Sequence, residues 1–228
     1  MIAVILAAGK GTRMGDVGKE TPKALLKVLG KTLLEHKLDE LPDSVSEVVL
    51  VVGYLKEKII TLLTENYGRL KITYIEQKEL LGTAHALWIC KEHLKNKEKF
   101  LVMMGDDIYA PEDMKECLRE PWSVLVSERD SVLGRAKVVF DKEGRIKDVL
   151  ERYTKDEPGF ICTGMYSLTP EIFNYEMLSI GGGEYGLPQT ILLAKRDHEI
   201  KSVQARFWLQ VNLSEDLEIA EQYFKMKK

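Results

Sequence analysis

The residues with the clearest chemical potential are those at positions 6–14, which read LAAGKGTRM and follow a short apolar run. Small residues after a strand let backbone N–H groups approach a phosphate without a Cβ in the way. A helix N-terminus or backbone nest at such a place adds a favourable dipole. Lys10, Thr12 and Arg13 would add positive charge and hydrogen-bond donors. The stretch therefore predicts a loop that binds a triphosphate.

Two other phosphate-binding loops fail at single positions. A dinucleotide-binding loop has the pattern G-x-G-x-x-G; Gly9 and Gly11 fit it, but Met14 stands where the third glycine belongs. A Walker A loop has the pattern G-x-x-x-x-G-K-[ST]. Residues 30–32 supply its end, but its first glycine would have to be at Leu25.

A pair of carboxylates follows another apolar run. Residues 100–104 are followed by Gly105, Asp106 and Asp107, and α/β folds place ligands at the carboxyl ends of such strands. A carboxylate at this place suits a hard divalent cation.

The elements that position these residues can be predicted from hydrophobic periodicity. Strands are predicted at 2–6, 48–52, 72–75 and 100–104, with helical spacing between them and a helix that Thr83 caps. This order predicts an α/β fold with a Rossmann-like, doubly wound, mostly parallel mixed sheet.

The second half is richer in strands. They are predicted at 123–126, 136–140, 146–150 and 161–168, with a hairpin turn at 141–144 and a last helix that Ser214 caps. We expect these strands to extend the same sheet or to form a small lobe over one edge. We expect a single domain over residues 1–228, with halves of about 1–110 and 111–228.

Composition narrows the function classes. Hydrophobic residues make up 45% and charged residues 30%, which is typical of a globular protein, and the net charge of -3 argues against broad binding to nucleic acid. The early apolar run is far shorter than the roughly 20 residues that cross a bilayer, so no membrane association is expected. The cysteines, Cys90, Cys117 and Cys162, lack zinc or disulfide spacing, and a cytoplasmic location is expected.

The motif LAAGKGTRM, followed by Pro22 and Lys23, resembles the signature of the sugar-1-phosphate nucleotidyltransferases. The resemblance implies a fold of the nucleotide-diphospho-sugar transferase type with a small sugar-side lobe. It also implies a Mg²⁺-dependent reaction of a nucleoside triphosphate with a sugar 1-phosphate, giving a nucleotide sugar and pyrophosphate. The GTAHA segment at 82–86 is most similar to the N-acetylglucosamine-1-phosphate uridylyltransferase branch. Without hexapeptide repeats, we expect no acyltransferase domain.

The resemblance assigns roles to residues that match the family motifs. Arg13, Lys23 and Asp106 would be catalytic, and Asp106 and Asn212 would hold Mg²⁺, with Gln210 as a weaker second ligand and Asp107 behind the metal or facing solvent. Nucleotide-binding residues would be Leu6, Ala7, Ala8, Gly9, Gly11, Thr12, Gln77, Gly82 and Thr83. Sugar-phosphate-binding residues would be Glu151, Arg152, Thr163, Gly164 and Glu184.

Some positions depart from the family pattern or leave the base open. Cys162 stands where a sugar-binding Asn is usual, and Pro188-Gln189 replaces a usual Thr-Asp pair. The Gln77 amide offers a donor and an acceptor side by side, which matches uracil or thymine, but a flipped amide would match cytosine. His85 is expected to be a helix residue that faces the sheet rather than a catalytic base.

The sequence therefore predicts an enzyme for small-molecule substrates, with UTP as the expected nucleotide. A thymidylyltransferase for dTTP and glucose 1-phosphate, or a cytidylyltransferase of the phosphocholine type, remains an alternative. A silent nucleotide-sensing subunit of the same fold is a further alternative, disfavoured because Arg13, Lys23 and Asp106 are retained. A homo-oligomer is left open.

Overall fold

The computed structural model describes residues 1–9 and 21–227. At its centre, strand β1 (Ile2–Ala7) lies between β4 (Glu47–Val52) and β7 (Phe100–Met104) and pairs in parallel with both. Nearly all side chains of these strands are buried, which is typical of inner parallel strands covered by helices on both faces. The strands predicted at 2–6, 48–52 and 100–104 are confirmed.

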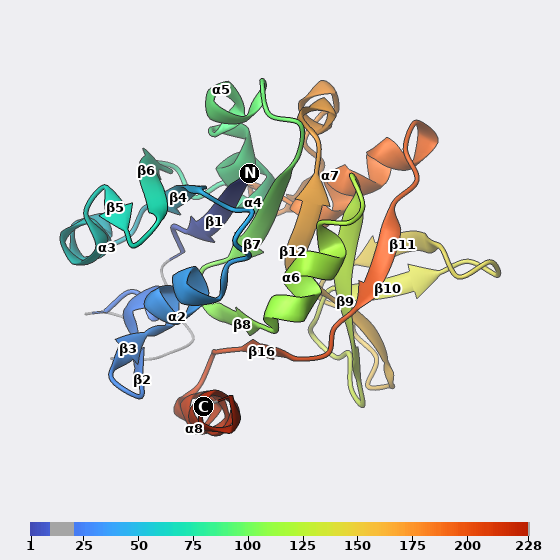
Figure 1. Cartoon of the computed structure of the whole chain (residues 1–228). Coiled ribbons are helices and arrows are strands. Elements are labelled where there is room, and N and C mark those ends of the chain that lie inside the picture. The colour runs from blue at the N-terminus through green and yellow to red at the C-terminus, as the bar shows by residue number, and fades with distance from the viewer. Residues whose placement is uncertain (10–20, 228) are drawn as a thin grey trace.

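The second half of the chain extends the same sheet. Within the described residues the sheet has ten strands, in the order β11-β10-β12-β7-β1-β4-β6-β5, with β9 on β12 and β15 on β9. Strand β12 runs antiparallel to β7, so an antiparallel part continues the parallel centre and the sheet is mixed (Figure 1). The other strands of this sheet are β5 (Asn66–Tyr67), β6 (Leu70–Glu76), β9 (Ser123–Arg129), β10 (Lys137–Phe140), β11 (Ile146–Leu150), β12 (Gly159–Leu168) and β15 (Lys201–Gln204).

Helices cover both faces of the sheet, as the doubly wound prediction requires. On one face, α4 (Gly82–Trp88), α5 (Lys91–Leu94) and α7 (Leu187–Leu193) share a core with Val4 and Val102. On the other face, α2 (Leu33–Glu40), α3 (Lys56–Leu63) and α6 (Pro111–Cys117) share a core with Ile5 and Leu50. Single 3-10 turns are η2 (Lys23–Leu25), η3 (Pro170–Asn174) and η4 (Ala194–Arg196).

The last helix, α8 (Ser214–Met226), packs on short strands instead of the main sheet and lies at the bottom of the view in Figure 1. Its Ala220 and Phe224 are buried in a cluster with Val28 and Ile108. The short strands form antiparallel pairs: β2 (Lys27–Val28) with β3 (Lys31–Thr32), β8 (Asp107–Tyr109) with β16 (Trp208–Gln210), and β13 (Ser179–Gly181) with β14 (Glu184–Tyr185).

Two predicted helix caps are wrong. Helix α4 already begins at Gly82, and the Thr83 hydroxyl accepts a hydrogen bond from the Leu187 N–H at 3.0 Å. Helix α8 begins at Ser214 itself. The Asp216 carboxylate accepts hydrogen bonds from the N–H groups of Asn212 and Leu213 at 2.7 and 2.8 Å. Thr83 thus ties α4 to α7, which is a tertiary contact that a local capping pattern does not reveal.

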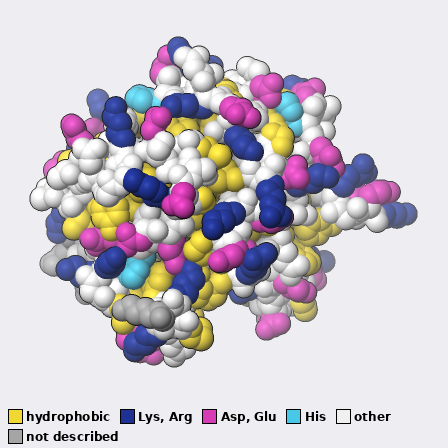
Figure 2. All heavy atoms as spheres, in the orientation of Figure 1, with side chains coloured by type: hydrophobic (Ala, Val, Ile, Leu, Met, Phe, Trp, Pro, Cys, Tyr) yellow, Lys and Arg dark blue, Asp and Glu magenta, His cyan; other side chains and the backbone are white. Residues whose placement is uncertain are grey.

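The surface is mixed in character. On the face drawn in Figure 2, Lys and Arg side chains are interspersed with Asp and Glu. Across residues 1–9 and 21–227, every helix is too short or too polar to span a membrane.

Gly105 allows β7 to pass close to β1, because a Cβ there would lie 2.8 Å from Ala7 Cβ and 3.1 Å from Leu6 O. Gly105→Ala should therefore lower the free energy of unfolding by about 1–3 kcal/mol through overpacking, as measured by urea denaturation. Gly159→Ala is the control, since the nearest atom to its Cβ would be a Val132 methyl group at 3.3 Å. Equal losses in the two variants would contradict this explanation.

Candidate active site

A cavity of about 630 Å³ opens at the carboxyl ends of the central parallel strands. This is the end of an α/β sheet at which ligands bind. Its walls come from the segment after β1, from residues 22–24, from the start of α4 and from the β13–β14 hairpin. The predicted nucleotide-binding residues that line it are Leu6, Ala7, Ala8, Gly9, Gln77, Gly82 and Thr83.

Lys23 lies at the centre of a polar cluster on this cavity. Its Nζ donates to Asn212 Oδ1 at 2.8 Å and to the Val211 carbonyl oxygen at 3.2 Å, and it lies 3.6 Å from Asp106 Oδ2. Lys23 is only 9% exposed, so water screens these contacts weakly. The structure thus brings together Lys23, Asp106 and Asn212, which the sequence places far apart.

The donor set of this cluster fits a hard divalent cation. Asp106, whose side chain is 32% exposed, offers a carboxylate, and Asn212 offers an amide oxygen. Both oxygens already face one cationic nitrogen, and Mg²⁺ commonly binds to few protein oxygens while keeping water or phosphate oxygens. Among the described residues, no three His, Cys, Asp or Glu side chains converge on one point, so phosphate or water oxygens would complete such a site. Gln210, the weaker predicted ligand, also lines the cavity that Lys23 and Asp106 line.

Asp107 is buried and does not face solvent, with 2% of its surface exposed. Its Oδ2 accepts hydrogen bonds from Trp208 Nε1 at 2.9 Å and Tyr109 OH at 3.3 Å. In the described part of the chain its Oδ1 has no hydrogen-bond partner. Burial, and then the neighbouring charge of Asp106, raise the pKa of Asp107 to about 8.

A buried lysine lies behind this pair of carboxylates. Lys37 of α2 is 3% exposed, donates to the Asp107 carbonyl oxygen and lies 4.7 Å from the centre of the Tyr109 ring. Burial lowers the pKa of Lys37 to about 8, although the charges of Asp107 and Asp106 oppose that shift. The positive charge of Lys37 in turn opposes the rise in the pKa of Asp107.

The predicted base-binding residues Gln77 and Gly82 line the same cavity. Gln77 follows β6 and is 5% exposed, and its Nε2 lies 3.1 Å from both the Gly82 carbonyl oxygen and His85 Nδ1. Gly82 has a φ of +89°, and a Cβ there would lie 2.5 Å from the Tyr185 carbonyl oxygen. His85, expected to face the sheet, contacts the Gln77 amide.

A second cavity, of about 380 Å³, adjoins the first, with Thr83, Met104, Glu151 and Gln210 in the walls of both. The predicted sugar-binding residues Thr163 and Gly164 line it, together with Cys162. The Thr163 hydroxyl donates to the Leu125 carbonyl oxygen at 2.9 Å, so its side chain ties β12 to β9.

Cys162 forms part of the wall of this second cavity. Its Sγ lies 3.2 Å from Tyr166 OH, and burial raises the pKa of the thiol to about 11. The side chain is therefore a neutral thiol near pH 7. It provides a weak donor where the family pattern has an amide.

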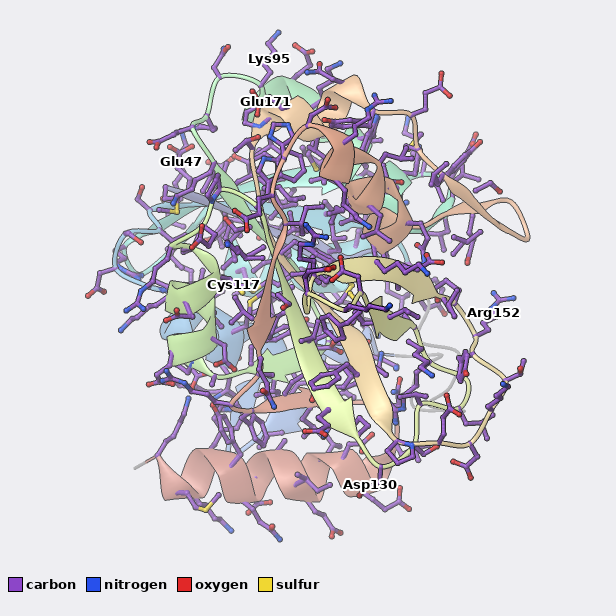
Figure 3. The ribbon with its side chains drawn as sticks, turned by 90° about the vertical axis from the view of Figure 1, so that its right-hand side faces the viewer. Glu47, Lys95, Cys117, Asp130, Arg152 and Glu171 are labelled. Atoms are coloured by element: carbon purple, nitrogen blue, oxygen red, sulfur yellow. The ribbon has the colours of Figure 1, made fainter. Side chains whose placement is uncertain are left out.

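The remaining predicted sugar-side residues are not all on the cavity walls. Glu151 lines both cavities, and its Oε1 accepts a hydrogen bond from Gln189 Nε2 at 3.0 Å. Glu184 lines the first cavity. Arg152 lies at the outer edge of the molecule in Figure 3, with a side chain that is 79% exposed and a guanidinium 4.0 Å from Glu184. It is outside the lining of both cavities.

The sequence analysis missed the residues that support this site. Lys37 has helical spacing with Leu34 and Leu41, but a lysine is usually exposed, so its residue type argued against burial. Nothing local indicated that Trp208 and Tyr109 would share Asp107 as a partner. Five residues of the predicted triphosphate loop, residues 10–14, lie outside the described residues, and the roles of Lys10, Gly11, Thr12 and Arg13 stay predictions.

The chain is similar to known sequences over most of its length. A family model described as nucleotidyl transferase matches residues 2–184. The chain is 36% identical over 234 residues to UTP–glucose-1-phosphate uridylyltransferase AglF of Haloferax volcanii, covering 97% of this chain and 96% of that protein. It is 30% identical over 226 residues to the bifunctional protein GlmU of Methanocaldococcus jannaschii, covering 98% of this chain and 54% of GlmU. The chain therefore spans about half the length of that relative.

Solved structures share the fold. The inositol-1-phosphate CTP transferase from T. maritima matches with a TM-score of 0.78 and 23% identity, covering all of this chain (100%) and 96% of the other. HddC from Yersinia pseudotuberculosis matches with a TM-score of 0.77 and 24% identity, covering 98% of this chain and 99% of the other. At these identities the likeness establishes the Rossmann-like fold.

The hydrogen bond between Trp208 and Asp107 can be tested directly. Trp208→Phe should lower the free energy of unfolding by about 1–3 kcal/mol, because it leaves the buried Asp107 carboxyl group without its indole donor. Tyr223→Phe is the control, since the Tyr223 hydroxyl is buried without a hydrogen-bond partner among the described residues. That variant should not be destabilised, and an equally small effect of Trp208→Phe would contradict a stabilising Trp208–Asp107 hydrogen bond.

The raised pKa of Asp107 predicts a dependence of stability on pH. Its folded pKa of about 8 lies above its unfolded value, so the folded state binds the proton more tightly. The resulting stabilisation is full below about pH 4 and is lost as the pH rises toward the folded pKa. The free energy of unfolding of the wild type, relative to Asp107→Asn, should therefore fall between about pH 5 and pH 8. Urea denaturation at each pH measures it, and a constant difference would contradict the raised pKa.

Proposed function

Because the chain belongs to the nucleotidyl transferase family, we propose that it transfers a uridylyl group from UTP to a sugar 1-phosphate and releases pyrophosphate. Sugar-1-phosphate nucleotidyl transfer is the activity of the family, and the choice of UTP and of the acceptor is the proposal. Glucose 1-phosphate is the first candidate acceptor, since a relative that is similar over nearly its whole length carries both substrates in its name.

The main support for this proposal is the set of residues that line one cavity. Gln77, whose amide can pair with a base edge, and the Lys23–Asp106 cluster, which can meet phosphates, line the same space of about 630 Å³. A nucleoside triphosphate has these two features at its opposite ends. The adjoining cavity at Thr163 and Gly164 leaves room for a second substrate.

The proposed reaction needs no proton transfer. An anionic oxygen of the sugar 1-phosphate attacks the α-phosphorus of UTP, the bond from that phosphorus to the bridging oxygen breaks, and pyrophosphate leaves with that electron pair. The difficulty lies in bringing two polyanions together, so charge neutralisation and orientation provide most of the acceleration. Buried cations serve this purpose better than exposed ones because water screens them less.

The residues of the cluster divide this task. Lys23 supplies a positive charge at the floor of the cavity, where the α-phosphate would lie. Asp106 and Asn212 would hold Mg²⁺, which when bound would supply further positive charge to the two phosphates. Arg13 is proposed to hold the leaving pyrophosphate. The silent-subunit alternative is less well supported, because Lys23 and Asp106 lie 3.6 Å apart on the cavity as this chemistry requires.

The sugar-side cavity favours a simple hexose over N-acetylglucosamine. Cys162 presents a neutral thiol that lies 3.2 Å from Tyr166 OH, and it lacks the two donors and the acceptor of the usual Asn. Fewer polar groups are therefore available for an acetamido substituent. Glu151, held by Gln189 at 3.0 Å, is proposed to accept hydrogen bonds from sugar hydroxyls.

A substrate matrix tests the proposal. Each of ATP, CTP, GTP, UTP and dTTP is combined with glucose 1-phosphate, N-acetylglucosamine 1-phosphate or phosphocholine in the presence of Mg²⁺, and pyrophosphate release is recorded. UTP with glucose 1-phosphate should give the highest kcat/KM. No release with any pair would refute the proposed reaction, and a preference for CTP with phosphocholine would replace the proposed substrates.

Asp106→Asn tests the role of the cluster. It should lower kcat by at least about 100-fold while changing the Kd of UTP much less, because the lost charge acts mainly in the transition state. Asp43→Asn is the control, since Asp43 is fully exposed and pairs with Arg69 at 3.5 Å, outside the cavity. An unchanged kcat of Asp106→Asn at saturating Mg²⁺ would contradict the role of Asp106.

A further inference from the structure

The Gln77 amide has two neighbours inside the protein that settle which of its atoms faces them. Its nitrogen lies 3.1 Å from the Gly82 carbonyl oxygen and 3.1 Å from His85 Nδ1. A carbonyl oxygen can only accept a hydrogen bond. The amide atom beside Gly82 must therefore be the nitrogen, because a flipped amide would place two acceptors in contact.

This orientation also settles the state of His85. The Gln77 nitrogen is a donor, so His85 Nδ1 must be the acceptor, and the ring carries its hydrogen on Nε2. Both hydrogens of the Gln77 amide are then used inside the protein, one on Gly82 and one on His85. Neither is left for a ligand.

The atom that remains is Gln77 Oε1. No hydrogen bond to it is found in residues 1–9 and 21–227, and Gln77 lines the nucleotide cavity although only 5% of its surface is exposed. An oxygen can only accept, so the amide selects a base whose facing ring nitrogen carries a hydrogen. N3 of uracil does, whereas N3 of cytosine is itself an acceptor.

We propose that His85 is a specificity-determining residue that locks the Gln77 amide and thereby makes the site select uracil over cytosine. The proposal rests on the proposed function, because it assumes that the base binds at Gln77. The Gly82 carbonyl oxygen accepts one of the two hydrogens of the Gln77 amide. His85 holds the other, and without it the amide can turn and present a donor to the N3 atom of cytosine.

The other partner of the lock is rigid. Gly82 has a φ of +89°, and its backbone is packed so closely on the β13–β14 hairpin that an added Cβ would lie 2.5 Å from Tyr185 O. The Tyr185 N–H donates to the Leu81 carbonyl oxygen at 2.9 Å, which fixes the hairpin to this turn. The Gly82 carbonyl therefore keeps its direction, and His85 is the partner that a substitution can remove.

Two substitutions of nearly equal size separate the acceptor from the packing. In His85→Asn, the side-chain oxygen can take the position of Nδ1, since both atoms are attached to Cγ, and the lock is kept. In His85→Leu, a methyl group takes that position and the acceptor is lost. The affinities for UTP and CTP are measured by calorimetry on the full chain, and thermal denaturation verifies that both variants fold.

The wild type should bind UTP at least about tenfold more tightly than CTP, which is a typical effect of one mismatched hydrogen-bonding edge. His85→Leu should narrow this ratio by at least about threefold, while His85→Asn should keep it within about twofold. Equal affinities in the wild type, or an unchanged ratio in a folded His85→Leu, would overturn the proposal.

A modified nucleotide provides a test that does not depend on the variants. In N3-methyl-UTP a methyl group replaces the N3 hydrogen, so it should bind to the wild type at least about fivefold more weakly than UTP. Equal binding would overturn the proposal even if His85→Leu did not fold. If the protein binds UTP selectively but releases no pyrophosphate with any sugar 1-phosphate, the proposed function is refuted. The proposed role of His85 would be unaffected by that result. If UTP is turned over but the ratio of UTP to CTP affinity is unchanged in folded His85→Leu, the role of His85 is refuted and the proposed function is kept.

Discussion

The rest of the site depends on one electrostatic constraint, the burial of a lysine ammonium among oxygens from distant segments. Lys23 is 9% exposed and contacts Asn212 at 2.8 Å and Asp106 at 3.6 Å. A buried charge is costly unless partners surround it, so the fold must deliver both partners to one place. β7 delivers Asp106 at its carboxyl end, and the segment after β16 delivers Asn212. Where the three residues meet, Lys23 places a positive charge in the cavity wall, which suits the phosphates of a nucleotide.

The two segments are held in place by a second polar layer beneath the first. Asp107 receives the Trp208 indole at 2.9 Å, and this contact crosses from β8 to β16, the strands next to Asp106 and Asn212. Lys37 binds the Asp107 carbonyl oxygen from α2. Each of these groups is nearly fully buried, and such networks fix geometry because any displacement leaves an unpaired polar group. The site is thus built on regular elements, with support from behind.

Much of the fold could be predicted from the sequence because its signals are local. The apolar runs at 2–6, 48–52 and 100–104 are short, which favours buried strands over helices. The phosphate loop predicted after the first run lies mostly outside the described residues and stays a prediction. The sequence could not show that Thr83 binds Leu187 across the fold instead of capping its own helix, because that contact depends on how α4 and α7 pack. Lys37 has the spacing of the buried face of its helix, but lysines are usually exposed, and the Asp107–Trp208 contact joins segments that are far apart in the sequence. Arg152 matched a motif by order alone, and the structure places it outside the lining of both cavities.

The central claim is that the cluster around Lys23 and the amide of Gln77 bind opposite ends of one nucleotide. The most direct measurement is a crystal structure of the protein with UTP and Mg²⁺. The account predicts the uracil edge at Gln77 Oε1, the phosphates beside Lys23, and one metal ion that both Asp106 and Asn212 contact. A nucleotide bound elsewhere, or Asp106 and Asn212 directed to separate places with no shared ion, would contradict it.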